Sequence, residues 1–205
     1  MSRKSLRQSG TRARIAAAAA RLMAQDGIDD FALAKRKAAR QLGATDAQAL
    51  PANDEIEAEL RAYRDLYEPG EHAERLAELR RIAVDAMRTF SAFRPYLTGP
   101  VLRGTAGPHA AIELQLFPES PKDVEIHLLN RSIPYATQEI RRYAGDRAHA
   151  VSVLMLEWLG APLRLSVFDR RDERVALKSS QAGRVAERAG IAEVSALLRD
   201  AAGST

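Results

Sequence analysis

The stretch that decides the fold runs from Thr98 to Leu129 and reads TGPVLRGTAGPHAAIELQLFPESPKDVEIHLL. A glycine-rich turn at 99–105 leads into two segments, 111–117 and 123–129, in which apolar residues alternate with polar ones. Alternation with a period of two residues is typical of a strand that has one buried face. We therefore expect two strands here, with a sheet at the centre of the second half of the chain.

The alternation also places polar side chains together. If Ile112 and Leu114 point inward, Glu113 and Gln115 point together to the opposite face. The same argument places Glu125 on the outward face of the next strand. We expect Glu113 and Glu125 on adjacent antiparallel strands, roughly 5–8 Å apart at Cβ. Acids gathered beside a glycine turn are suited to holding Mg²⁺ and a triphosphate.

This order of turn and acids resembles the nucleotidyltransferase superfamily. The core of that superfamily carries a Gly-Ser turn, a short helix, a strand with an Asp-x-Asp pair and a third acid on a following strand. The resemblance implies that Gly99 and Pro100 take the Gly-Ser positions. It places the paired acids at Glu113 and Gln115 and the third acid at Glu125.

The resemblance also implies an activity and a set of roles. A hydroxyl would attack the α-phosphorus of a nucleoside triphosphate, with Mg²⁺ neutralising the developing charge. Glu113 and Glu125 would be the catalytic residues, and the metal ligands would be these two with Gln115. Backbone N–H groups and a guanidinium would hold the phosphates, supplied by Gly99, Arg103, Gly104 and Thr105.

Two positions depart from the superfamily pattern. Pro100 offers a phosphate neither a hydroxyl nor an N–H, and Gln115 is a neutral ligand where a hard cation prefers a carboxylate. If Glu113 is matched to the second acid instead, Ala111 stands at the first and a ligand is again lost. The pattern is degenerate in both alignments. A non-catalytic nucleotide-binding or interaction module is therefore an alternative to an active transferase.

Over nearly its whole length the chain is also similar to a group of short uncharacterised bacterial proteins. The similarity lies in the stretches 34–42, 95–99 and 115–126. Members are labelled nucleotidyltransferase-like or, in some cases, UDP-N-acetylmuramate–alanine ligase. The ligase label implies a Gly-Lys-Ser or Gly-Lys-Thr phosphate loop, and neither tripeptide occurs in this sequence. The residues therefore favour the nucleotidyltransferase-like label.

The composition indicates a folded protein of the reducing cytoplasm. Its 205 residues are 46% hydrophobic, enough to bury a core as one large domain or two small ones. Without cysteine, the chain forms neither a disulfide framework nor a thiolate metal site. No segment approaches the length of a transmembrane span, so we expect a soluble protein without a membrane partner.

Positive charge is concentrated at the N-terminus. Residues 1–42 carry ten Lys and Arg against three Asp and Glu, a net charge of +7, and the rest of the chain has a net charge of −3. Such asymmetry can indicate a nucleic-acid contact. It also fits solvated helix faces or pairing with the acidic segment 54–78, which is the interpretation we favour.

The N-terminal helix resembles the first helix of TetR-type repressors. The similarity is carried by Thr11-Arg12-x-Arg14-Ile15, Ala18-Ala19, Leu22-Met23 and Asp26-Gly27. The basic stretch 35–40 lies roughly where the helix-turn-helix of those proteins begins. A DNA-binding regulator is therefore a second alternative, although the stretch 44–51 carries no arginine or aromatic residue to reach a groove.

Periodicity predicts helices first and strands afterwards. Apolar residues at three-to-four spacing predict helices over 11–27, 30–43, 53–68 and 71–93, behind a disordered tail at 1–10. Further strands are expected at 151–158, 163–168 and 174–177, and a last helix at 191–201. The predicted class is α+β: a helical region at 11–93, then a mixed or mostly antiparallel sheet of nucleotidyltransferase-like type at 94–205.

Overall fold

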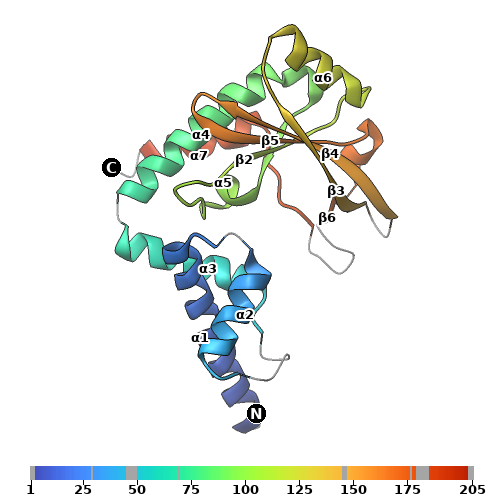
Figure 1. The fold of residues 1–205 in the computed structure, drawn as a ribbon. Coiled ribbons are helices and arrows are strands. Elements are labelled where there is room, and N and C mark those ends of the chain that lie inside the picture. The colour runs from blue at the N-terminus through green and yellow to red at the C-terminus, as the bar shows by residue number, and fades with distance from the viewer. Residues whose placement is uncertain are drawn as a thin grey trace. The chain divides into compact units, whose positions relative to one another are not determined.

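The computed structural model describes residues 3–28, 30–44, 50–68, 70–144, 147–175, 177–178 and 185–202. The chain divides into two compact units, Met1–His72 and Ala73–Thr205. The first is helical, and the second combines a six-stranded sheet with helices (Figure 1). The α+β class is therefore confirmed. Among the helices that the structure describes, none has the length and apolar composition needed to cross a bilayer.

The N-terminal unit packs three helices through small side chains. They are α1 (Arg3–Asp26), α2 (Phe31–Gln41) and α3 (Asn53–Tyr67). Alanine dominates the buried faces of α1 and α2, and Ile15, Ile56 and Leu60 fill the space between the helices. The Asp30 carboxylate begins α2 by accepting a hydrogen bond from the Ala32 N–H at 2.7 Å.

The structure corrects the predicted start of the first helix. α1 begins at Arg3 rather than Thr11, so residues 3–10, expected to be a disordered tail, are helical. Nothing in that polar stretch breaks a helix except Gly10, and a single glycine costs only about 1 kcal/mol in a helix interior. Residues 45–49, within the stretch 44–51 that was considered as a possible DNA-reading segment, lie outside the described residues.

The boundary between the units falls at the beginning of α4 (Glu71–Thr89). The sequence predicted a division after residue 93, with this helix in the helical region. The structure differs because Ile82, Met87 and Phe90 pack on the sheet of the second unit. An amphipathic pattern shows that a helix has a buried face, but it does not show which partner covers that face.

The sheet of the second unit has the order β1-β2-β5-β4-β3-β6. Its strands are β1 (Tyr96–Thr98), β2 (Ile112–Leu116), β3 (Ala136–Ala144), β4 (Arg147–Trp158), β5 (Ala161–Val167) and β6 (Leu177–Lys178). The β2–β5 pair is parallel, and the other pairs are antiparallel. The strands expected at 111–117, 151–158 and 163–168 are confirmed. The one expected at 174–177 is reduced to β6, and β1 and β3 were not predicted.

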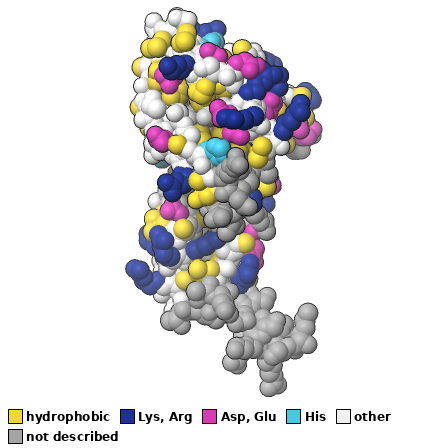
Figure 2. Space-filling model, turned by 90° about the vertical axis from the view of Figure 1, so that its right-hand side faces the viewer, with side chains coloured by type: hydrophobic (Ala, Val, Ile, Leu, Met, Phe, Trp, Pro, Cys, Tyr) yellow, Lys and Arg dark blue, Asp and Glu magenta, His cyan; other side chains and the backbone are white. Residues whose placement is uncertain are grey.

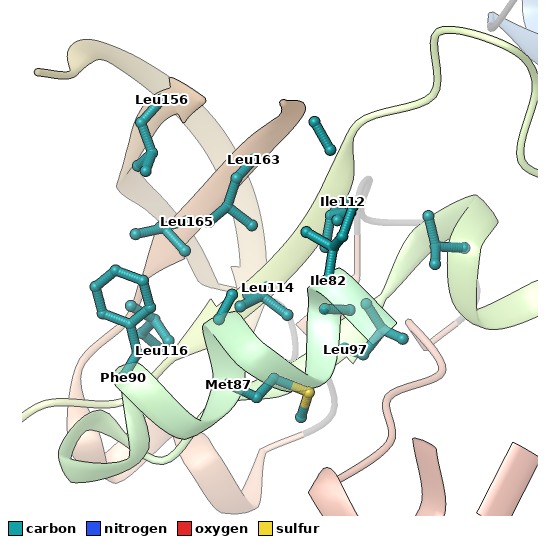
Figure 3. Packing of buried hydrophobic residues seen from close by; sticks show 14 of the residues in the cluster. Ile82, Met87, Phe90, Leu97, Ile112, Leu114, Leu116, Leu156, Leu163 and Leu165 are labelled. Atoms are coloured by element: carbon teal, nitrogen blue, oxygen red, sulfur yellow. The ribbon is translucent and has the colours of Figure 1, made fainter. Parts of the chain in front are cut away.

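One face of the sheet carries the main core. Leu97, Ile112, Leu114, Leu116, Leu163 and Leu165 point toward Ile82 and Met87 of α4 and toward Phe90, which directly follows that helix (Figure 3). The same core takes Val101 from α5 (Gly99–Arg103), Val124 and Leu128 from α6 (Pro121–Asn130), and Val194 from α7 (Ile191–Ala202). All these helices therefore contribute to the Leu114 side of the sheet.

The strand predicted over 123–129 is wrong, because this segment is the helix α6. The Ser120 N–H donates to Asp123 Oδ2 at 3.2 Å, and Pro121 is the first helical residue. Both features are typical of the N-terminus of a helix. Val124 and Leu128 are fully buried, whereas Ile126 is 53% exposed. Val124, Ile126 and Leu128 are two residues apart, as in a strand, but Val124 and Leu128 are also four residues apart, as on one face of a helix. The structure has the helix, with Val124 and Leu128 on its buried face.

The opposite face of the sheet closes on itself. Tyr96 of β1 and Ile140 of β3 pack against one small cluster of Phe117, Val151, Phe168 and Leu177, although β2, β5 and β4 lie between β1 and β3 in the sheet order. The segment 185–189 joins the two edges, since Val185 bridges to Lys178 and Ala189 bridges to Leu97. The sheet is thus strongly curled, with this second face on the inside.

Candidate functional site

Glu113 projects from β2 onto the inner face of the curled sheet. Its neighbours Ile112 and Leu114 are fully buried on the other face, as the alternation predicted. The carboxylate lies against Gly99, the first residue of α5. A Cβ added at Gly99 would lie 2.6 Å from Glu113 Oε2, and Gly99 has a φ of +74°. The positive φ favours glycine at this position, and any other residue would also displace the Glu113 carboxylate.

A guanidinium stands directly beside this acid. In the parallel β2–β5 pair, Glu113 is in register with Arg164, and Arg164 Nη1 lies 3.9 Å from Glu113 Oε1. Arg142 of β3 also lies within electrostatic reach. Burial lowers the pKa of Arg142, and the negative charge of Glu113 acts in the opposite direction. The Glu113 carboxylate thus lies beside the Arg164 guanidinium and within electrostatic reach of Arg142.

The glycine turn is a closed helical turn rather than an open phosphate loop. The N–H groups of Gly104 and Thr105 both donate to the carbonyl oxygen of Pro100, the latter at 2.9 Å. From α4, Arg80 donates to the carbonyls of Val101 and Leu102, each at 3.2 Å. The predicted role of Gly104 and Thr105 as phosphate ligands is therefore wrong, because their N–H groups are already used within the turn.

Arg103 ends the same turn. It is the last residue of α5, and its side chain is partly buried. Its Nε atom is fully covered by protein, so this part of the guanidinium is not presented to a ligand. The structure thus brings Gly99 and Glu113 together, but it does not arrange residues 103–105 as a cradle.

The three predicted Mg²⁺ ligands are not brought together. Glu125 lies on α6, which packs on the Leu114 side of the sheet through Val124 and Leu128, whereas Glu113 projects from the other side. Glu113 and Glu125 are therefore not on adjacent strands, and that expected geometry is wrong. Among the described residues, no group of three or more Asp, Glu, His or Cys is placed to hold a metal ion. These residues do not fit a two-carboxylate magnesium site.

Gln115 has a separate environment on the inner face. It is only 6% exposed, and its Oε1 atom is buried without a hydrogen-bond partner in the described part of the chain. The side chain lines a pocket of about 210 Å³ together with Arg174, Val175, Leu177, Val185, Ala186 and Arg188. An orphaned buried acceptor costs stability, because it loses its hydrogen bonds to water on folding and gains none in return.

Arg188 is held in place beside this pocket. Its guanidinium lies over the ring of Tyr96 at 4.8 Å and near the ring of Phe117 at 5.5 Å, and it donates to the backbone carbonyl of Glu173. Burial acts to raise the pKa of Glu173, but hydrogen bonds from Tyr96 and Arg94 outweigh it and hold the pKa below its ordinary value. Arg188 therefore enters the pocket as a preorganised cation.

The positive charge of the N-terminal unit is partly neutralised by acidic residues of the same unit. Arg12 Nε and Nη2 donate to the Glu55 carboxylate at 2.6–2.9 Å. Lys37 Nζ lies 3.5 Å from Asp26 Oδ2. Arg14, Arg36 and Arg40 are exposed. Lys and Arg side chains are spread over the visible face of this unit rather than gathered in one patch (Figure 2).

Four arginines of the two inner-face sites were not predicted. Arg164 lies between the apolar residues Leu163 and Leu165, so the sequence predicts that its side chain is on the opposite face of β5 from theirs. The pairing of β5 with β2 could not be predicted, because the two strands are far apart in the sequence. Arg142, Arg174 and Arg188 carried no signal, since β3 and the curling of the sheet were not foreseen.

Comparisons of the chain with protein-family models, with curated proteins and with solved structures gave no match. Function is therefore inferred from the chemistry of these residues.

Proposed function

We propose that the second unit is a nucleotidyltransferase-like module that binds the phosphates of a nucleoside triphosphate without transferring the nucleotidyl group. The observation that carries this proposal is the pairing of Glu113 with Arg164 across β2 and β5. A transferase of this kind places carboxylates there to hold a divalent cation. Here a guanidinium occupies the neighbouring position.

The charge balance of the inner face favours an anion. Arg164 and Arg142 supply two positive charges against the single carboxylate of Glu113. A guanidinium is planar and binds phosphate oxygens in pairs, and it remains charged at any physiological pH. It can therefore neutralise a phosphate as a metal would. It cannot activate an attacking hydroxyl, which in a transferase is the role of the metal ion that the carboxylate pair holds.

The order of elements supports the nucleotidyltransferase-like part of the proposal. β1 leads into Gly99 and the short helix α5, and the chain then returns as β2 with Glu113 against that glycine. This is the sequence of turn, short helix and acid-bearing strand that the resemblance implies. The loss of a second acid beside Glu113 supports binding without catalysis.

The test is a titration of the full chain with ATP and GTP, once with excess EDTA and once with Mg²⁺. We expect binding that does not depend on the metal, because the arginines carry the neutralising charge. Arg164→Gln should weaken it about tenfold, as expected for one charge-assisted contact. Arg199→Gln is the matched control, since Arg199 is an exposed residue in the last turn of α7.

Two results would overturn this function. One is absence of triphosphate binding under both conditions while the protein is folded. The other is release of pyrophosphate with Mg²⁺ or Mn²⁺ that Glu113→Gln abolishes, which would restore the active transferase.

A further inference from the structure

We infer that His127 is a pH-sensitive latch, which holds α6 on the core while its imidazole is neutral and loosens the helix when the ring is protonated. This inference goes beyond the proposed function, because it concerns the Leu114 side of the sheet rather than the inner face. It rests on the aromatic side chains that pack against His127 and on a buried nitrogen atom of its ring.

The His127 ring packs against two phenylalanines of the core. Its centroid lies 5.4 Å from that of Phe90 and 5.3 Å from that of Phe93, the last residue of the short helix η2 (Ser91–Phe93). Both phenylalanines are buried in the main core, which also takes Val124 and Leu128 from α6. The His127 contacts therefore help to fix α6 on the same core as its two buried aliphatic residues.

This position suits a neutral imidazole. The Nε2 atom is buried and has no hydrogen-bond partner among the residues that the structure describes. A neutral ring can leave that nitrogen without a proton, whereas a charged ring carries a proton on both nitrogens. Protonation of the packed ring would thus bury a charged N–H that has no acceptor, and this costs more than an unpaired neutral atom.

Charged groups of α6 do not offset this cost. Arg131 lies one helical turn after His127, and its positive charge opposes a second one. Asp123 lies one turn before His127, but its carboxylate accepts a hydrogen bond from the Ser120 N–H at the start of the helix. Burial and, to a smaller extent, the charge of Arg131 lower the pKa of His127 below its ordinary value. The other charged residues of the helix are Lys122 and Glu125.

The elements packed against the ring do not supply a counter-ion. Arg94, which follows η2, donates to the Glu173 carboxylate at 2.8 Å. Asp85 of α4 accepts a hydrogen bond from Trp158 Nε1 at 2.8 Å, and Arg88 of the same helix is exposed and has the same sign of charge as an imidazolium. Within the described part of the chain, no acid forms an ion pair with His127.

The direction of the pH effect follows from the lowered pKa. A histidine whose pKa is lower in the folded state than its unfolded value of about 6.5 binds a proton more readily once it is released. The stability that its packing contributes is therefore fully present above about pH 6.5 and is lost as the pH falls from there through the folded pKa. We expect α6 to leave Phe90 and Phe93 more often in acid.

NMR of the full chain between pH 5 and pH 8 tests the latch. The His127 ring should titrate below the ordinary value of about 6.5. Hydrogen exchange of the α6 amides, corrected for the intrinsic effect of pH, should show opening about threefold or more frequent at pH 5 than at pH 7.5. The amides of β5 provide the internal reference, because the opening of one helix leaves that strand protected.

Three variants assign the effect to this ring. His127→Phe keeps an aromatic ring and removes the titration, so the excess opening of α6 in acid should disappear. Arg131→Gln removes the repelling charge, so it should raise the pKa of His127 and reduce the excess opening. Arg131 is exposed, so this variant also serves if His127→Phe does not fold. His109→Gln is the control, since His109 is exposed and should leave the α6 profile unchanged.

Three results would overturn the inference. One is titration of His127 at or above about pH 6.5. Another is an acid-dependent opening of α6 that persists unchanged in His127→Phe or, where that variant does not fold, in Arg131→Gln. The third is an equal acid dependence in α6 and β5, which would indicate a loss of stability of the whole unit rather than the release of one helix.

Discussion

The carboxylate of Glu113 occupies the space in which any residue other than glycine at position 99 would place its Cβ. The distance from that Cβ position to Glu113 Oε2 is 2.6 Å, and to the Glu113 Cβ it is 3.3 Å. The contact joins the first residue of α5 to the centre of β2. It links the glycine turn to the acid-bearing strand, the two features on which the proposed function depends.

Gly99→Ala should destabilise the second unit. The left-handed backbone alone costs an alanine about 1–2 kcal/mol, and displacement of the Glu113 side chain adds to this cost. Gly160→Ala is the matched control, because Gly160 has a φ of +82° and no atom within 4 Å of an added Cβ. Denaturant unfolding should show the larger loss for Gly99→Ala, and Glu113→Ala should remove the excess. Equal losses in both glycine variants would contradict the contact.

Substitutions in α6 should follow a helical pattern of burial. Leu128→Ala removes a fully buried side chain and should cost about 2–5 kcal/mol of unfolding free energy. Ile126→Ala alters a side chain that is 53% exposed and should cost well under about 1 kcal/mol. In a strand both residues would share one face, so similar losses at the two positions would argue for the strand. Urea unfolding of the two variants measures the difference.

Glu113→Gln should strengthen triphosphate binding in EDTA. Removing the one carboxylate beside Arg164 and Arg142 leaves their positive charge uncompensated, and the gain should be about two- to fivefold at this partly exposed site. The prediction depends on the proposed function. A magnesium-dependent transferase would behave in the opposite way, because the same change would remove a metal ligand. A loss of affinity would therefore count against binding through the arginines.

The N-terminal unit should lose stability in acid through Glu55. Hydrogen bonds from Arg12 and from the Ala52 N–H hold the pKa of Glu55 below its ordinary value. A group whose pKa is lowered by folding stabilises the folded state above its unfolded pKa, and the contribution disappears as the pH falls through the folded pKa. In Glu55→Gln this acid-dependent loss should shrink. Hydrogen exchange of α1 and α3 against pH measures it, and an unchanged profile would contradict the role of the ion pair.

Much of the fold could be predicted because its signals are local. The helix α4 follows from the four-residue spacing of Leu79, Ala83 and Met87, and β2 and β5 follow from strict alternation. The alternation of β2 was also predicted correctly, with Glu113 and Gln115 on the face opposite Leu114, but Gln115 is buried there rather than exposed to solvent. Each of these features depends on residues within a few positions of one another.

The candidate site could be predicted only in part. The approach of Gly99 to Glu113 follows from a turn and the strand after it. The separation of Glu125 from Glu113 does not, because residues 123–129 fit both a two-residue and a four-residue period. That choice depends on the surface available to Val124 and Leu128, which the rest of the sheet supplies.

By itself the sequence determined the helical first half and the strands β2, β4 and β5, since apolar periodicity is a property of short segments. Only the tertiary structure decided that Arg164 stands beside Glu113 and that Gln115 meets Arg174 and Arg188 in one pocket. These neighbours come from strand pairing and from the curling of the sheet closed by residues 185–189. Such contacts depend on the free energy of packing the whole unit, which no short stretch of residues encodes.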